Sequence, residues 1–476
     1  MKRVILFTYA MVINLYIVIF YLDRIFPHDY LQMALSLLGV LSLMLSLIHL
    51  SAQKRLLPLF LLAFSFFILI ASHTSIVDGV LQGFRQMTSL IALLLIVPII
   101  SWILDEEPYI VKIMSFAGDF LNTSRRFYFG LMIITQVLSF FLLFGSIQTV
   151  YQFIQGFLGN KEGEAWENFK GTAILRAFSL CTLWVISIPS FAFIVNFLNA
   201  SLWISMVQGA FISFCAILLA VLFSYFEEKH YKIDITSGIQ EEIHKVIKSK
   251  SKGKLSREVI EFIGLFIFIF GTIFCFHSVF RLEILVLIPP VILIYTLLYF
   301  LFKRRYISLK KNIRFYFNEY LQAKSQQFSI LLSVGFVIVA LNLSGWGKKL
   351  IDGILFIEQS IPYMNLLSIL PFVPMILSFC GIGPLPVLVL VGGVLQNISL
   401  PYPPELLVLS ITSGSVISAL LSPLILPTIV LSSENGLSIF KNGFQFNIAY
   451  AAVFYLFVQA YLHPSSTVNR HIFRNL

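Results

Sequence analysis

The feature that most constrains the fold is a succession of apolar runs long enough to cross a membrane. Residues 4–22 and 328–344, for example, contain no Asp, Glu, Lys or Arg. A helix of about 20 apolar residues spans the hydrocarbon core of a bilayer. Because 58% of the chain is hydrophobic and only 12% is charged, a soluble fold cannot bury this much apolar surface. We predict an all-α polytopic membrane protein with about 12–14 membrane segments.

The expected spanning helices follow these apolar runs: 4–22, 31–50, 56–72, 89–104, 127–150, 172–197, 201–226, 262–280, 282–302, 328–344, 364–380, 383–398, 405–431 and 444–463. The first run follows Lys2-Arg3 and lacks a small-residue cleavage site, so we expect a retained helix and no signal peptide. The four cysteines lie at scattered positions inside apolar runs, which favours packing over metal binding or disulfides.

Basic residues concentrate in two polar segments. Residues 229–257 hold eight Lys or Arg and residues 303–324 hold seven, together 15 of the 33 in the chain. The positive-inside rule places loops 227–257 and 303–324 in the cytoplasm. Such clusters can also bind nucleic acid, but beside membrane helices topology and anionic lipid explain them better. We expect a multi-pass protein of a bacterial inner membrane that contacts lipid and binds no nucleic acid.

Two stretches about 275 residues apart read as diverged copies of each other. Val77-Asp78-Gly79 and Ile351-Asp352-Gly353 each precede an apolar run that ends on Val-Pro and then Ser. Farther on, GLMIITQVLSFFLLFGSIQTV at 130–150 corresponds to LVLSITSGSVISALLSPLILP at 407–427. A duplicated half in a membrane protein is typical of secondary transporters.

The repeat divides the chain into five expected parts. Residues 1–55 form an N-terminal helix pair, 56–226 the first repeat and 227–257 a basic linker with a flexible stretch at 249–254. Residues 258–325 form a helical hairpin followed by an amphipathic interfacial helix over 303–324. Residues 326–476 form the second repeat.

Topology predicts that the two repeats run in opposite directions. Counting crossings back from a cytoplasmic 227–257 places the start of helix 56–72 outside, whereas helix 328–344 starts inside. The same count leaves Met1 outside, although Lys2 and Arg3 favour the inside. The 15 loop charges outweigh the two terminal ones.

The most polar intramembrane stretch is 410–428. Its hydroxyls, glycine and prolines predict a broken helix, whose freed amides and carbonyls can bind an anion and a coupling cation. The alternative is close helix packing by small residues. The candidate ligands here are Thr412, Ser413, Gly414, Ser415, Ser418, Ser422 and Pro423.

The matching stretch of the first repeat is polar but lacks a Ser-Pro pair. It supplies Thr135, Ser139, Ser146 and Thr149 as candidates. The predicted break at Ser422-Pro423 therefore has no counterpart in the first copy. Residues 379–386, between two short apolar runs, predict either a re-entrant hairpin or a plain turn.

Charged residues near the membrane give further candidates. Asp78 and Asp352 are possible coupling residues, although each sits where a short amphipathic segment is expected to begin and so also suits a helix cap. Arg176 can neutralise an anion or extend to the membrane interface. No P-loop, nucleophile elbow or zinc-ligand spacing occurs, so we expect no enzyme, cofactor or metal site.

Residues Gly414 to Leu426, with Leu-Leu-Ser-Pro at 420–423 and Phe440-Lys441 beyond, resemble the second-repeat signature of the ion transporter superfamily. Leu370-Pro371-Phe372 and Gly381-Ile382-Gly383 are similar to the hairpin region of an uncharacterised integral-membrane branch. The resemblance covers mainly 326–465 and more faintly 56–200. It implies inverted repeats with discontinuous helices and carriage of small organic anions.

The expected function is secondary active transport of a small organic anion coupled to H⁺ or Na⁺, with substrate between segments 135–149 and 410–428. A homodimer is left open. Two alternatives remain at this point: a non-transporting scaffold that recruits a partner through its basic loops, and a flippase for a lipid-linked precursor.

Overall fold

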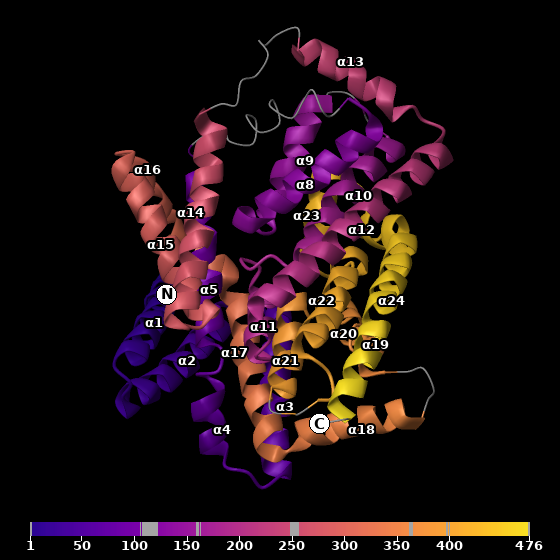
Figure 1. Cartoon of the computed structure of the whole chain (residues 1–476). Helices are drawn as coiled ribbons and strands as arrows, with labels where there is room; N and C mark the ends of the chain where they lie inside the picture. The colour runs from indigo at the N-terminus through magenta and orange to yellow at the C-terminus, as the bar shows by residue number, and fades with distance from the viewer. Residues whose placement is uncertain are drawn as a thin grey trace. The chain divides into compact units, whose positions relative to one another are not determined.

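The computed structural model describes the chain except residues 1, 105, 107–121, 159–160, 162, 248–256, 361–364, 397, 399 and 475–476. The predicted linker at 249–254 lies outside the described residues. Within the described chain the regular elements are all helices (Figure 1), and eleven helical runs are long and apolar enough to cross a membrane. Leu366–Phe379 and Pro384–Leu395 are two shorter apolar helices. The predicted polytopic all-α membrane class is confirmed.

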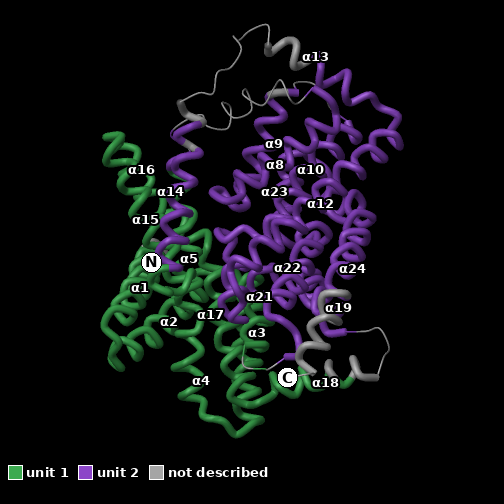
Figure 2. The backbone as a smooth tube through the Cα atoms, in the orientation of Figure 1, with its two compact units in different colours: residues 1–102, 279–364, 389–399 green, residues 103–278, 365–388, 400–476 purple. Residues whose placement is uncertain are grey.

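The chain forms two compact units, each built from separate stretches of sequence (Figure 2). Unit 1 comprises Met1–Trp102, Val279–Met364 and Val389–Ser399. Its helices are α1 (Lys2–Ile25), α2 (Asp29–His49), α3 (Ala52–Ala71), α4 (Ile76–Gly83), α5 (Thr88–Ile96), η1 (Val97–Ile100), α15 (Ile284–Phe302), α16 (Tyr306–Phe315), η3 (Tyr316–Tyr320), α17 (Leu321–Ser344) and α18 (Trp346–Ser360).

Unit 2 comprises Ile103–Ser278, Asn365–Leu388 and Leu400–Leu476. Its helices are α8 (Ser124–Leu142), α9 (Gly145–Leu158), α10 (Glu164–Cys181), α11 (Pro189–Phe197), α12 (Leu202–Tyr231), α13 (Ile235–Ile247), α19 (Leu366–Ile369), α20 (Phe372–Phe379), α22 (Pro404–Leu421), α23 (Leu426–Asn435), η4 (Lys441–Gln445) and α24 (Phe446–Arg474). Three helices cross a unit boundary in sequence: α6 (Ser101–Leu104), α14 (Arg257–Phe280) and α21 (Pro384–Leu395).

In unit 1, α17 is the central helix and packs against α2, α3 and α4. Near its start, Ser325 Oγ bonds His49 Nε2 at 2.8 Å, just before α3 begins. Near its end, Trp346 stacks edge-on against Phe67 of α3. Helices α3 and α17 therefore run parallel. The predicted opposite directions of 56–72 and 328–344 are wrong for this pair.

A different pair in unit 1 does run antiparallel. Tyr320 OH donates to Leu94 O at 3.0 Å, whereas Phe336, farther along α17, stacks on Phe84. At this crossing a Cβ on Gly335 would lie 2.7 Å from Gly83 O, so the two backbones are in close contact. Small residues permit such an approach between membrane helices.

Several expected elements differ in the structure. Run 172–197 is not one helix, because α10 ends at Cys181 and α11 begins only at Pro189. Stretch 410–418 is not broken but lies inside α22, whose interruption follows at 422–425. The expected interfacial helix at 303–324 is helical from Tyr306 and continues through a π-helical turn into α17, with no separate span at 328.

Candidate functional site

Two helical hairpins and two interrupted helices are gathered in unit 2. The first hairpin is α8–α9, whose turn contains Leu143 with a φ of +48°. The expectation that the first copy has no break is therefore wrong. The second hairpin is α20–α21, whose turn contains Gly381 with a φ of +84°. A 14-residue and a 12-residue helix are about 21 and 18 Å long, too short for the 30 Å core.

Contacts with α10 show that α8–α9 folds back on itself. Along α8, Tyr128 bonds Thr172 and the Phe140 ring lies against Trp184, so α8 runs parallel to α10. Along α9 the order reverses, because Phe144 stacks on Phe178 whereas Tyr151, farther along α9, bonds Glu167.

Each interrupted helix is tied to one hairpin by a serine. In the first interruption, at 182–188, Ser187 Oγ donates to Phe140 O at 2.6 Å, close to the α8–α9 turn. In the second, at 422–425, Ser422 Oγ donates to Ser378 O at 2.9 Å, close to the α20–α21 turn. Backbone at an interruption has lost its helical partners, so these side chains help to fix its position.

Helix α10 is the centre of this arrangement. Every residue from Ala165 to Cys181 is buried, and α10 packs against α8, α9, α12, α22 and α23 (Figure 1). Three of its buried residues, Glu167, Lys170 and Arg176, carry ionisable side chains. Buried charge is costly unless it is paired and hydrogen-bonded.

Arg176 is fully buried and joins four helices of unit 2. Its Nη2 donates to Glu227 Oε1 of α12 at 2.7 Å, Nη1 to Tyr128 OH of α8 at 3.2 Å, and Nε to Asn447 Oδ1 of α24 at 2.9 Å. Its Cζ lies 4.7 Å from the centre of the Tyr450 ring. The alternative that this arginine extends to the membrane interface is wrong.

Lys170 forms a second buried network with α9. Its Nζ pairs with Glu167 and also donates to Gln155 Oε1 at 2.8 Å. The other oxygen of Glu167 accepts from Tyr151 OH at 2.7 Å. At the start of α10, Lys441 Nζ donates to Glu164 Oε2 at 2.6 Å, and this hydrogen bond lowers the pKa of the exposed Glu164 carboxyl.

The predicted residues of the second copy lie in two groups. On α22, Thr412, Ser413 and Ser418 bond carbonyls of their own helix, as hydroxyls do in tight packing. Gly414 lies against Pro371, where a Cβ would approach the carbonyl oxygen to 2.2 Å. Ser415 Oγ is buried with no partner among the described residues.

The second group marks the interruption itself. Ser422 and Pro423 lie where α22 has ended, and Thr428 Oγ1 donates back to Ser422 O at 2.8 Å. In the first copy, Ser139 and Ser146 meet across the α8–α9 turn with 2.8 Å between their hydroxyl oxygens. Thr135 and Thr149 bond carbonyls one turn earlier in α8 and α9.

The two repeated aspartates lie apart from this arrangement in sequence and burial. Asp78 is exposed in the first turn of α4, capped by Ser75. Asp352 is also exposed, but it is the seventh residue of α18 and not a segment start, which corrects that expectation. Their assignment as coupling residues stays a prediction.

Sequence reasoning missed Ser187, Ser378 and the buried pairs of α10. The available signal was three ionisable residues at 167, 170 and 176, within a stretch that is otherwise largely apolar. No group of three or more His, Cys, Asp or Glu side chains comes together in the part of the chain that the structure describes. The chain matches no family model and no curated protein.

Proposed function

We propose that this protein is a secondary active transporter that carries a small organic anion, coupled to H⁺ or Na⁺. The observation that carries the proposal is the pair of interrupted helices in unit 2, each tied to the turn of a helical hairpin. Interrupted helices in membrane carriers expose amides and carbonyls to substrate and coupling ion. Most of the predicted ligands, Ser139, Ser146, Ser422 and Pro423 among them, lie at these turns and interruptions.

We infer an inverted duplication whose register differs from the one the Asp-Gly stretches suggested. A constant offset of 238 residues relates Leu143 to Gly381, the two positive-φ turn positions, and also Pro189 to Pro427, which begin the second parts of the interrupted helices. The same offset relates Phe140 to Ser378, the two carbonyls that accept the serine hydrogen bonds.

Helix directions support an inverted relation at this register. Start and end of α10 are marked by Lys441 against Glu164 and by Glu405, at the start of α22, against Ser201. Helices α10 and α22 are therefore antiparallel, as are α12 and α24, where Tyr450 contacts Ala216 and Tyr461 contacts Phe211. The resemblance to the ion transporter superfamily agrees with such an arrangement.

Two features favour an anion and a proton. The interruptions place the N-termini of α11 and α23, which carry partial positive charge, inside unit 2. The Glu227 carboxylate pairs with Arg176 through Oε1, while its buried Oε2 has no partner among the described residues. A proton on Glu227 weakens that pair and makes the Arg176 guanidinium available to a substrate carboxylate.

Uptake into proteoliposomes tests the proposal. Purified protein is assayed with labelled mono-, di- and tricarboxylates under an imposed H⁺ or Na⁺ gradient. Loss of one hydrogen bond costs about 0.5–1.5 kcal/mol, so Ser187→Ala and Ser422→Ala are expected to slow uptake by up to about tenfold. Ser224→Ala is the matched control, because this buried hydroxyl bonds only a carbonyl of its own helix.

Absence of uptake under both gradients, together with wild-type behaviour of both serine variants in cells, contradicts transport. The scaffold alternative is separated by deleting residues 248–254 while keeping α13, which packs on α8 and α9. A carrier retains uptake after this deletion, whereas a scaffold loses its cellular function. Movement of a fluorescent lipid-linked probe in the same vesicles tests the flippase alternative.

A further inference from the structure

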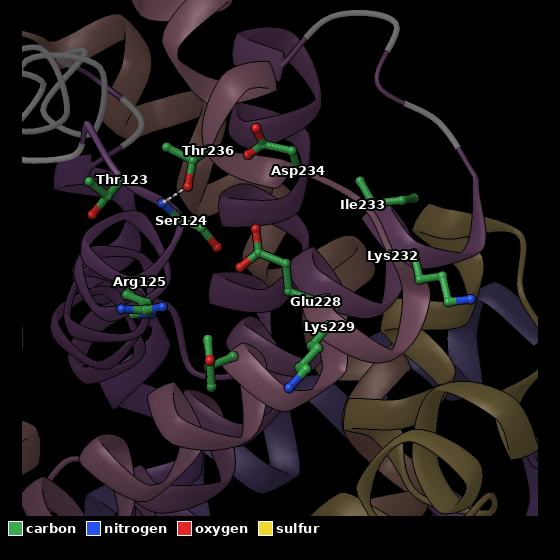
Figure 3. A pocket seen from close by; sticks show the side chains of 10 residues that line it. Thr123, Ser124, Arg125, Glu228, Lys229, Lys232, Ile233, Asp234 and Thr236 are labelled. Atoms are coloured by element: carbon green, nitrogen blue, oxygen red, sulfur yellow. Dashed lines mark hydrogen bonds between the residues drawn. The ribbon is translucent and has the colours of Figure 1, made fainter.

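A cavity of about 580 Å³ lies at the start of α8, wholly within unit 2. Figure 3 shows residues from three elements around it: Thr123 to Arg125 at the start of α8, Glu228 and Lys229 near the end of α12, and Asp234 with Thr236 at the start of α13. This volume is in the range of small-ligand sites in proteins. None of these residues belongs to the hairpins' turns or the interruptions described above.

Ser124 provides the first indication of a ligand. The residue is 2% exposed, and its backbone amide donates to Thr236 Oγ1 at 3.2 Å. Its side-chain Oγ is buried and has no hydrogen-bond partner in the part of the chain that the structure describes. In Figure 3 this hydroxyl points into the space between Arg125 and Glu228. Buried hydroxyls are normally hydrogen-bonded, so the group suits a bound molecule.

One side of the cavity carries positive potential. Helix α8 is 19 residues long and begins here, so its N-terminal amides and partial positive charge meet the cavity. The Arg125 guanidinium lies 4.5 Å from the centre of the Tyr225 ring, which holds it at the rim. Lys229 lines the opposite rim. A helix N-terminus flanked by Arg and Lys is a favourable environment for phosphate.

The other side carries two carboxylates that are only partly used. Glu228 Oε1 accepts from the Ile235 amide at 3.1 Å, and Asp234 Oδ1 accepts from the Ser237 amide at 3.1 Å. Each carboxylate keeps a second oxygen that can accept from a hydroxyl or ammonium group. A ligand that fits both sides therefore carries a phosphate and, a few bonds away, hydrogen-bond donors.

We propose that this cavity binds a phosphate ester whose alcohol part carries hydroxyl or amino groups. The phosphate lies at the α8 N-terminus with Ser124 and Arg125, and the donors lie toward Glu228 and Asp234. Glycerophospholipid headgroups and soluble glycerol phosphates share this chemistry. Because loop 227–257 is expected to be cytoplasmic, the lipid source is the inner leaflet.

Thermal unfolding of the full chain in a neutral detergent tests the site. The probes are inorganic phosphate, glycerol 3-phosphate, and short-chain phosphatidylglycerol, phosphatidylethanolamine and phosphatidylcholine. We expect glycerol 3-phosphate or the short-chain phosphatidylglycerol to raise the melting temperature, with inorganic phosphate weaker. Tighter binding of the lipid than of glycerol 3-phosphate identifies a headgroup site, and the reverse order identifies a soluble ester.

Variants tie the effect to the cavity. Arg125→Gln and Lys229→Gln are expected to weaken binding by at least about tenfold each, since each removes a charge-assisted contact. Arg126→Gln is the matched control, because Arg126 bonds Asn122 and does not line the cavity. Ser124→Ala is expected to weaken binding without lowering the ligand-free melting temperature.

Two results overturn the proposal. One is a melting temperature that none of the five probes raises in the unaltered protein. The other is an equal loss of binding in Arg125→Gln and Arg126→Gln. Both readouts are independent of transport, so failure of the transport assay leaves this site standing and failure here leaves the transport proposal standing.

Discussion

Gly414 lies where α22 comes into direct contact with the backbone before α20. A Cβ at this position would approach Pro371 O to 2.2 Å and Pro371 Cα to 2.7 Å, and backbone atoms cannot yield as a flexible side chain does. We expect Gly414→Ala to destabilise the protein by at least about 3 kcal/mol, the upper part of the range for overpacking. The measurement is denaturant or thermal unfolding in detergent.

Gly156→Ala is the matched control for this prediction. Gly156 lies in α9 of the same unit, and a Cβ there meets no atom within 4 Å. Alanine is favoured over glycine inside a helix, so this variant is expected to gain about 0.5–1 kcal/mol. Equal stability of the two variants contradicts the close contact at Gly414.

The Arg176–Glu227 pair gives a second prediction for single residues. Glu227→Ala leaves a fully buried guanidinium with its opposite charge removed, and breaking a buried pair in this way costs about 3–5 kcal/mol. Replacing both partners, as Arg176→Met with Glu227→Ala, removes the unpaired charge and is expected to recover part of that loss. A double-mutant cycle measured by unfolding provides the coupling energy.

A double variant no more stable than Glu227→Ala contradicts this account of the pair. The sequence could not predict the pairing, because Arg176 and Glu227 are 51 residues apart and Asn447 is farther still. Position in an apolar run leaves an arginine two ordinary solutions, extension to the interface or burial with a partner. Only the packing of α12 and α24 around α10 decides between them.

At the level of elements, hydropathy predicted the long lipid-facing helices within a few residues. Runs 31–50, 201–226 and 282–302 correspond to α2, α12 and α15, because transfer into lipid depends on local composition. The hairpin turns and interruptions depend instead on tertiary contacts. The α8–α9 turn, Leu143-Phe144, has no proline and reads as part of an apolar helix.

Leu143 should therefore be a strained position. Its φ of +48° and ψ of −125° belong to a region that glycine adopts far more readily than other residues, and the position 238 residues later holds Gly381. Residues in such regions cost about 1–3 kcal/mol. We expect Leu143→Gly to raise stability by about 1 kcal/mol or more, measured by unfolding in detergent.

The neighbouring residue supplies the control. Leu142 is the last residue of α8, where glycine lowers helix stability by about 1 kcal/mol. Leu142→Gly is accordingly expected to destabilise while Leu143→Gly stabilises. Loss of stability in both variants to the same extent contradicts strain at the turn.

For the whole molecule, the α8–α9 hairpin changes the count of membrane crossings. The sequence alone predicted one crossing over 127–150, which puts the start of that helix outside. In the structure, Ser124 at the start of α8 bonds Thr236, beside the basic segment expected to be cytoplasmic. A hairpin returns the chain to the side it left, so the start of α8 lies inside, where Arg125 and Arg126 satisfy the positive-inside rule.

Removing one crossing also moves the N-terminus to the inside, which agrees with Lys2 and Arg3 and resolves the conflict that the sequence left open. Cysteine labelling from each face of oriented vesicles, in a background without the four native cysteines, tests this topology. Cysteines at positions 122 and 252 are expected to react from the cytoplasmic face. A cysteine at exposed Asn199, in the turn before α12, should react from the opposite face. Labelling of 122 and 199 from one face returns 127–150 to a simple crossing and removes the hairpin from the transport proposal.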